Sequence, residues 1–181
     1  MFCQLDRLRR CLSPRIRRAL EELPETLDET YERTLLDIDD ENWAYAHRLF
    51  QCIVSAPRSL SVEELAEFLA LKSEAGGRII FEGTWRPENP KDTVLSTCSS
   101  LVTVVNVEGS AVIQFSHFSV KEYLTSSIAE GHVSRYYISL EPAHIFVARA
   151  CLSILFKLDK HVTKTSAEEH PACLVCWSVL G

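Results

Sequence analysis

A run of β-branched residues from Leu101 to Val107 is followed by Glu108, Gly109 and Ser110 and then by a second apolar run, Ala111 to Phe115. Residues of this type favour strands, and a short glycine-containing turn between two such runs indicates an antiparallel hairpin. The chain on both sides of this hairpin shows helical periodicity instead. We therefore expect a mainly α protein with a small β-hairpin.

Helix-start signals divide the rest of the chain. In a capping box, Ser or Thr is followed three residues later by Glu, and the two residues satisfy each other's free backbone N–H groups. This pattern begins at Thr26, Ser61 and Ser119. With proline stops and apolar periodicity, it predicts helices at about 1–12, 14–23, 27–38, 41–56, 62–71, 91–100, 120–127 and 142–158.

The order of the expected elements points to a winged helix-turn-helix flanked by helices. A helix, a short extended piece at Arg58 to Leu60, two helices and the hairpin follow one another, with residues 101–117 as the wing. Residues 72–90 are glycine- and proline-rich and are expected to be irregular, except for a brief strand at Ile79 to Phe81. The predicted parts are an N-terminal helical segment (1–40), a winged-helix domain (41–127), a C-terminal helical segment (128–160) and an irregular tail (161–181).

The long helix that begins at Pro142 carries apolar residues around most of its circumference. A helix of this kind is usually buried on more than one side. We therefore expect it to lie in a core or against a following domain outside this sequence.

The charge distribution argues against DNA binding, which is the alternative function for a winged helix. The expected second helix of the motif carries Lys91 as its one cation, with Asp92 beside it, and residues 42–117 hold six Lys or Arg against eight Asp or Glu. Neutralising phosphates is the main source of non-specific DNA affinity. A DNA-binding function would therefore depend on the arginines of the first eighteen residues, such as Arg15, Arg17 and Arg18. An acidic stretch, 25–41, follows these arginines and can pair with them or with a partner.

No motif for catalysis or for a bound cofactor is found. The phosphate-binding patterns G-x-x-x-x-G-K-[ST] and G-x-G-x-x-G and the nucleophile elbow G-x-S-x-G are all missing, and Gly76-Gly77 leads into Arg78 without the required lysine. We expect a protein that is not an enzyme and has no cofactor.

The cysteines and the absence of targeting signals indicate a reducing compartment. Seven cysteines are scattered through apolar segments, which is typical of free thiols. Cys173 and Cys176, with His161 and His170 upstream, have zinc-ligand chemistry, but they lack the supporting turns of a closed site, and we expect no metal. No secretory signal or membrane span is evident, and we expect a cytoplasmic protein with no membrane partner.

His117 is the strongest candidate for a functional residue. Ser119 and Glu122 predict a helix beginning at Val120, which places His117 at the corner between a strand and a helix. There its imidazole can donate a hydrogen bond to an anion such as a phosphate. A structural role at the corner is the alternative, because isolated histidines are more often satisfied within the fold.

Four segments resemble one region of a known family: Leu23 to Arg33, Ser61 to Ala66, Val94 to Val102 and Phe115 to Leu124. Together they resemble the winged helix and flanking helices that follow the nucleotide-binding domain in fungal NACHT-type STAND (NLR-like) proteins. This domain family is also named after GPI inositol-deacylase proteins. The resemblance covers roughly residues 1–171.

The resemblance gives His117 a specific role. In animal and plant relatives of this class, a histidine near the end of the winged helix contacts the β-phosphate of bound ADP. The pattern F-x-H-x-S-x-x-E-[FY] matches Phe115 to Tyr123, so that His117 is the nucleotide-phosphate sensor that the resemblance implies for a full-length parent.

By the same resemblance, the chain is a non-catalytic regulatory and protein-interaction module that couples nucleotide state to assembly. The implied partners are an adjacent NTPase domain, an ankyrin or WD repeat domain, or a second copy. We expect a fragment that lacks the NTPase domain and the repeats, because neither is found in the sequence. A structural spacer or gene-fragment remnant remains an alternative to the regulatory module and to DNA binding.

Overall fold

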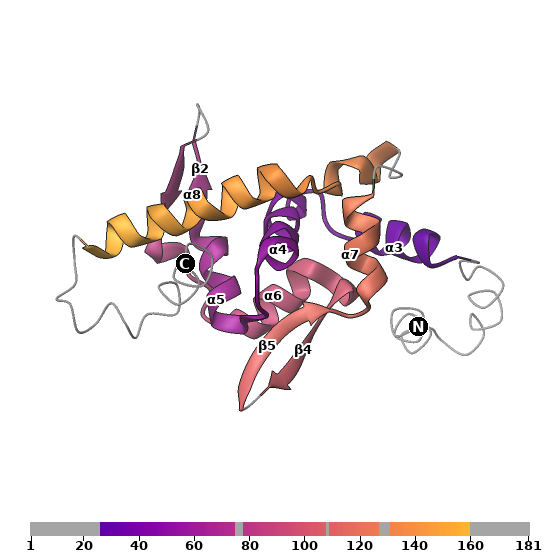
Figure 1. Ribbon diagram of the computed structural model, residues 1–181, viewed down its shortest axis with the longest axis horizontal. Coiled ribbons are helices and arrows are strands. Elements are labelled where there is room, and N and C mark those ends of the chain that lie inside the picture. Colours follow the sequence, from indigo (N-terminus) through magenta and orange to yellow (C-terminus); the bar gives the residue numbers. More distant parts are fainter. Residues whose placement is uncertain (1–25, 75–77, 108, 127–130, 160–181) are drawn as a thin grey trace.

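The computed structural model describes residues 26–74, 78–107, 109–126 and 131–159. Helices and strands expected outside these ranges, including those within 1–25, lie outside the described residues. The described part is mainly helical with two small antiparallel sheets, so the expected fold class is confirmed (Figure 1). In chain order the elements are α3 (Leu27–Leu36), α4 (Trp43–Ser55), β1 (Leu60–Ser61), α5 (Val62–Glu67), η1 (Phe68–Ala70), β2 (Leu71–Ser73), β3 (Ile79–Phe81), η2 (Gly83–Trp85), α6 (Pro90–Cys98), η3 (Ser99–Leu101), β4 (Val102–Val107), β5 (Ser110–Phe115), α7 (Phe118–Thr125), η4 (Gly131–Tyr136) and α8 (Leu140–Asp159).

Strands β4 and β5 form the hairpin that the β-branched run predicts. Gly109 has a φ of +86° at the turn, a backbone conformation that glycine adopts without steric cost. The hairpin is extended by β1, which pairs with β5 through Leu60 opposite Ile113, giving the strand order β1-β5-β4. The expected two-stranded hairpin is thus part of a three-stranded sheet. Leu60 is buried, and its burial draws the short extended piece onto the edge of β5.

Residues 72–90 are not irregular throughout as expected, because residues 72 and 73 belong to strand β2. The brief strand expected at Ile79 to Phe81 is confirmed as β3. Strand β2 pairs with β3 through Leu71 opposite Phe81, and the 3₁₀ helix η2 follows. A three-residue strand has too few positions to display an alternating pattern. Helix α5 ends as an α-helix at Glu67, earlier than expected, and continues as η1.

Helix α4 runs through the middle of the molecule and contributes the large buried side chains Leu49 and Phe50 (Figure 1). It contacts both α6 and α8, while α5 contacts α6. Between α5 and α6 the chain forms η1, β2, β3 and η2, where the sequence pattern predicts an irregular segment with one brief strand. Buried residues of α3 and α8 belong to the same hydrophobic cluster as those of α4, α5 and α6, so the flanking helices share one core with them.

Candidate functional site

The site lies where the chain leaves the sheet at Phe115 and enters α7. Backbone N–H of Ser116 still donates to the carbonyl of Leu101, and the next residue, His117, keeps an extended conformation (φ −150°, ψ 147°). The Nδ1 atom of His117 accepts a hydrogen bond from the backbone N–H of Ser119 at 3.3 Å. His117 is therefore the N-cap residue of α7, which begins at Phe118.

This geometry corrects the prediction that Ser119 caps a helix starting at Val120. Ser119 lies inside the first turn, and its hydroxyl oxygen is 2.6 Å from His117 Nδ1 and 2.7 Å from the hydroxyl oxygen of Tyr31. Tyr31 belongs to α3, which packs against α7, and the ring centroids of Tyr31 and Tyr123 are 5.5 Å apart. The sequence pattern predicts Tyr31 only as an apolar position of its helix. No local signal connects residues that are 88 positions apart.

The hydrogen bond from the backbone N–H of Ser119 favours one tautomer of His117. Because the backbone N–H of Ser119 donates to Nδ1, this nitrogen acts as an acceptor and, in the neutral ring, the proton is on Nε2. In this tautomer the Ser119 hydroxyl can donate to Nδ1 and accept from the Tyr31 hydroxyl. This chain of donors leaves Nε2–H as the donor that His117, which is exposed, can offer to another molecule.

Acidic residues of α3 lie near Tyr123, on the helix that His117 caps. Burial raises the pKa of Tyr123, and the nearby carboxylates of Glu32 and Asp28 raise it further. Both carboxylates belong to exposed residues of α3. A single neutral imidazole donor at an exposed corner contributes too little free energy to hold a free phosphate by itself.

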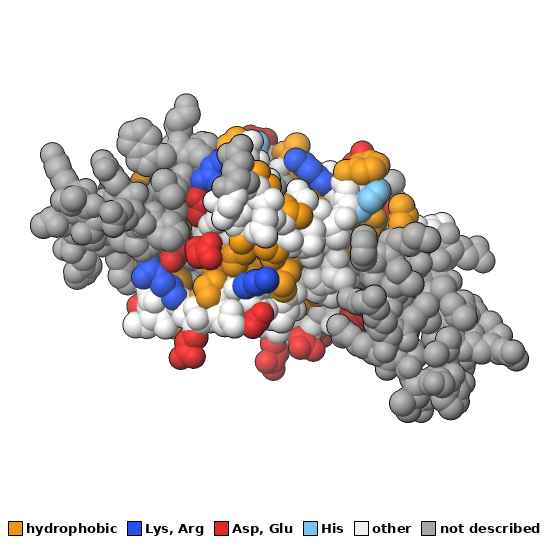
Figure 2. Space-filling view, turned by 90° about the horizontal axis from the view of Figure 1, so that it is seen from below, with side chains coloured by type: hydrophobic (Ala, Val, Ile, Leu, Met, Phe, Trp, Pro, Cys, Tyr) orange, Lys and Arg blue, Asp and Glu red, His pale blue; other side chains and the backbone are white. Residues whose placement is uncertain are grey.

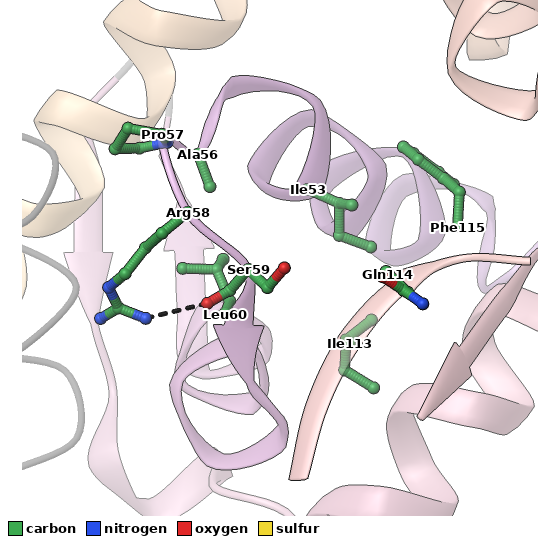
Figure 3. A pocket seen from close by; sticks show the side chains of 9 residues that line it. All are labelled: Ile53, Ala56, Pro57, Arg58, Ser59, Leu60, Ile113, Gln114 and Phe115. Atoms are coloured by element: carbon green, nitrogen blue, oxygen red, sulfur yellow. Dashed lines mark hydrogen bonds between the residues drawn. The ribbon is translucent and has the colours of Figure 1, made fainter. Parts of the chain in front are cut away.

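A pocket lies beside the start of β1. It has a volume of about 390 Å³ and is bounded by the C-terminal end of α4, by the chain around Arg58 to Leu60 and by β5 (Figure 3). The guanidinium of Arg58 donates to the carbonyl of Ser59 and makes two hydrogen bonds to the carboxylate of Glu64, so its charge is already balanced. Apart from Arg58, Ser59 and Gln114, the residues that line the pocket are apolar. The full lining is Ile53, Ala56, Pro57, Arg58, Ser59, Leu60, Ile113, Gln114 and Phe115.

Nothing in the described ranges resembles a metal centre. No group of three or more His, Cys, Asp or Glu side chains there is arranged to hold an ion. Burial raises the pKa of the Cys52 and Cys98 thiols, which makes them poor nucleophiles and ligands. Burial also lowers the pKa of His47, whose ring is 3.2 Å from the carbonyl oxygen of Tyr137. The candidate zinc ligands His161, His170, Cys173 and Cys176 lie outside the described residues.

Basic and acidic side chains are mixed on the described surface. On α6, Lys91 and Asp92 are both exposed, so the cation has an anion beside it. Figure 2 shows one face of the molecule, on which basic and acidic side chains are interspersed among apolar ones. Arg15, Arg17 and Arg18, on which DNA binding would depend, lie outside the described residues.

No helix in the described residues is long and apolar enough to cross a membrane. No protein-family model matches the sequence, and no solved structure matches the fold. The chain is similar to the azaphilone pigments biosynthesis cluster protein L of Monascus ruber, with 30% identity over 143 residues, or 76% of this chain. It spans 30% of the length of that protein.

Proposed function

We propose that this chain is a non-catalytic regulatory module that binds another protein domain and responds to the nucleotide held there. In this proposal the chain belongs with the winged-helix region of NACHT-type STAND proteins, and His117 is its phosphate-sensing residue. The adjoining NTPase domain is the proposed partner, and the cytoplasm is the proposed location.

The observation that supports the proposal best is the hydrogen-bond chain from Tyr31 through Ser119 to His117. It holds the imidazole with Nε2–H as an available donor at an exposed corner. A donor that touches a phosphate in one arrangement of two domains gives the nucleotide a differential affinity for that arrangement. Such a difference is what couples ligand state to assembly.

His117 offers a single donor, and this limits how the response works. One exposed imidazole does not hold a free phosphate, so the phosphate is presented by a partner whose own cations hold it. We therefore expect the chain alone to have negligible affinity for ADP. The exposed carboxylates of α3 are then available to meet the cations of that partner.

The similarity to a protein of a pigment biosynthesis cluster suggests the setting in which such a module would act. The description of that protein names a cluster and no reaction. A regulatory role within a biosynthesis cluster is the corresponding proposal for this chain.

The test uses the full chain and a separately expressed NACHT-type nucleotide-binding domain. Binding is measured by calorimetry with that domain loaded with ADP and without nucleotide. We expect ADP to strengthen the association. His117→Ala should weaken binding to the ADP-loaded domain by roughly 10- to 150-fold, because a hydrogen bond to a charged group contributes roughly 1.5–3 kcal/mol.

His144→Ala is the matched control, because His144 is an exposed histidine on α8. It should bind like the wild-type chain. The proposal fails if His117→Ala and His144→Ala bind the ADP-loaded domain equally well, or if the purified chain itself hydrolyses ATP.

A further inference from the structure

Helix α8 has two opposite apolar faces, and one of them is not covered by any other element that the structure describes. Its inner face contacts α4 and β3 and buries Ala143, Val147, Ala150, Cys151 and Ile154. On the outer face, Ile145, Leu152 and Phe156 are 48%, 43% and 69% exposed. Figure 1 shows α8 lying along one side of the molecule, in orange to yellow. A surface helix normally has a polar outer face, so this one differs from a helix that only covers the core.

The spacing of the outer residues is that of a helix–helix seam. Ile145, Arg149, Leu152 and Phe156 follow one another at intervals of four, three and four residues. This alternation places side chains in a single line along a helix and is the spacing at which two helices interlock. The line from Ile145 to Phe156 is about 16 Å long, at 1.5 Å per residue.

Arg149 indicates which charge a partner of this face would carry. It is exposed, and within the described residues it has no ion-pair partner. An arginine on an apolar seam is desolvated when a helix docks there, and it then needs a carboxylate opposite.

A second copy of the chain does not satisfy this requirement. In parallel pairing, Arg149 of each copy faces Arg149 of the other. In antiparallel pairing that covers all three apolar residues, the two Arg149 side chains lie less than one helical turn apart along the seam. Shifting the register to bring Glu141 opposite Arg149 leaves Phe156 beyond the partner's helix, which begins at Leu140.

We propose that the outer face of α8, formed by Ile145, Arg149, Leu152 and Phe156, binds an amphipathic helix of another protein segment. That helix carries apolar residues at three- and four-residue spacing and an Asp or Glu opposite Arg149. This inference goes beyond the nucleotide response at His117 and does not depend on it.

The test uses two synthetic helical peptides of 21 residues with leucines at the seam positions. One has Glu and the other has Lys at the position opposite Arg149. Binding of each to the full chain is measured by fluorescence anisotropy. We expect the Glu peptide to bind with roughly three- to tenfold higher affinity than the Lys peptide, and Arg149→Glu to reverse this preference.

Phe156→Asp should weaken binding of the Glu peptide by more than tenfold. Phe118→Asp is the matched control, because Phe118 is 71% exposed on α7 and lies outside the proposed seam. Both substitutions are at exposed positions, and circular dichroism should show wild-type folding for each.

Three results would overturn the proposal. The first is equal affinity of the two peptides, or no binding of either. The second is a dimer in sedimentation equilibrium that Phe156→Asp dissociates. The third is binding of the wild-type chain to phosphatidylcholine–phosphatidylserine vesicles that Phe156→Asp abolishes. The second would identify another copy as the occupant, and the third would identify a lipid surface.

Discussion

Helices α5 and α7 begin with the same local pattern, a serine followed three residues later by a glutamate, yet they are capped in different ways. At α5, Ser61 Oγ accepts from the backbone N–H of Glu64 at 3.1 Å, and the Glu64 carboxylate accepts from the backbone N–H of Ser61 at 2.8 Å. At α7, the cap is His117, and Ser119 lies one residue inside the helix.

The difference arises from what surrounds each serine. The carboxylate of Glu64 is nearly buried and is held by Arg58, so the capping box at α5 is reinforced by an ion pair. The hydroxyl of Ser119 instead lies between Tyr31 and His117. At α7 the serine hydroxyl thus contacts Tyr31, from a distant part of the chain, instead of capping the helix. The capping-box pattern therefore favours a helix start without fixing it.

The largest effect is expected from Glu64→Ala. It removes the carboxylate of the capping box and leaves the Arg58 guanidinium without its ion-pair partner. We expect a loss of about 3 kcal/mol in the free energy of unfolding. Glu122→Ala removes the corresponding, exposed glutamate of α7 and should cost less than about 0.5 kcal/mol. Urea denaturation of both variants measures the difference, and equal losses would mean that the two helix starts are capped alike.

The hydrogen bond between Tyr31 and Ser119 is tested by a double-mutant cycle. Tyr31→Phe and Ser119→Ala should each lower the free energy of unfolding by about 1 kcal/mol. Their combined loss should be smaller than the sum, because both remove the same bond. Tyr45→Phe, at a half-buried tyrosine of α4, serves as the control and should have little effect. Strict additivity of the two substitutions in thermal or urea unfolding would argue against the bond.

A third helix start shows what a cap contributes at an exposed position. Thr26 Oγ1 accepts from the backbone N–H of Glu29 at 3.1 Å at the start of α3. Thr26→Ala should lower the free energy of unfolding by roughly 0.5–1 kcal/mol, while Thr26→Ser should leave it nearly unchanged. If Thr26→Ala lowered the free energy of unfolding as much as Glu64→Ala, the exposed cap of α3 would stabilise the protein as much as the cap of α5 that an ion pair reinforces.

Among the N-cap residues of these helices, the smallest effect on stability is expected at His117. His117→Ala should lower the free energy of unfolding by about 0.5 kcal/mol, and His117→Asn should lower it less, because asparagine is a favourable N-cap. Both variants should nevertheless lose the ADP-dependent part of binding to a nucleotide-binding domain. If His117→Asn restores stability and also this binding, His117 is a capping residue without a sensing role.

Much of the fold could be predicted because the signals are local. The β-branched run gave the hairpin, and the capping boxes at Thr26 and Ser61 gave the starts of α3 and α5. Strand β2 could not be predicted, because its three residues pair with β3 through a register that the surrounding packing selects. For the site, His117 and its place at a corner followed from the sequence, but its capping role and its link to Tyr31 through Ser119 did not.

By itself, the sequence determined where most of the helices and the β4–β5 hairpin form, because helix caps, turns and side-chain periodicity act over a few residues. The tertiary structure decided how two identical patterns were used. Packing of α3 against α7 brought Tyr31 within hydrogen-bond distance of Ser119, and this contact oriented His117 as a donor. Packing also decided which apolar face of α8 is buried against α4 and which is left exposed, because burial depends on what lies opposite a side chain and not on its neighbours in the chain.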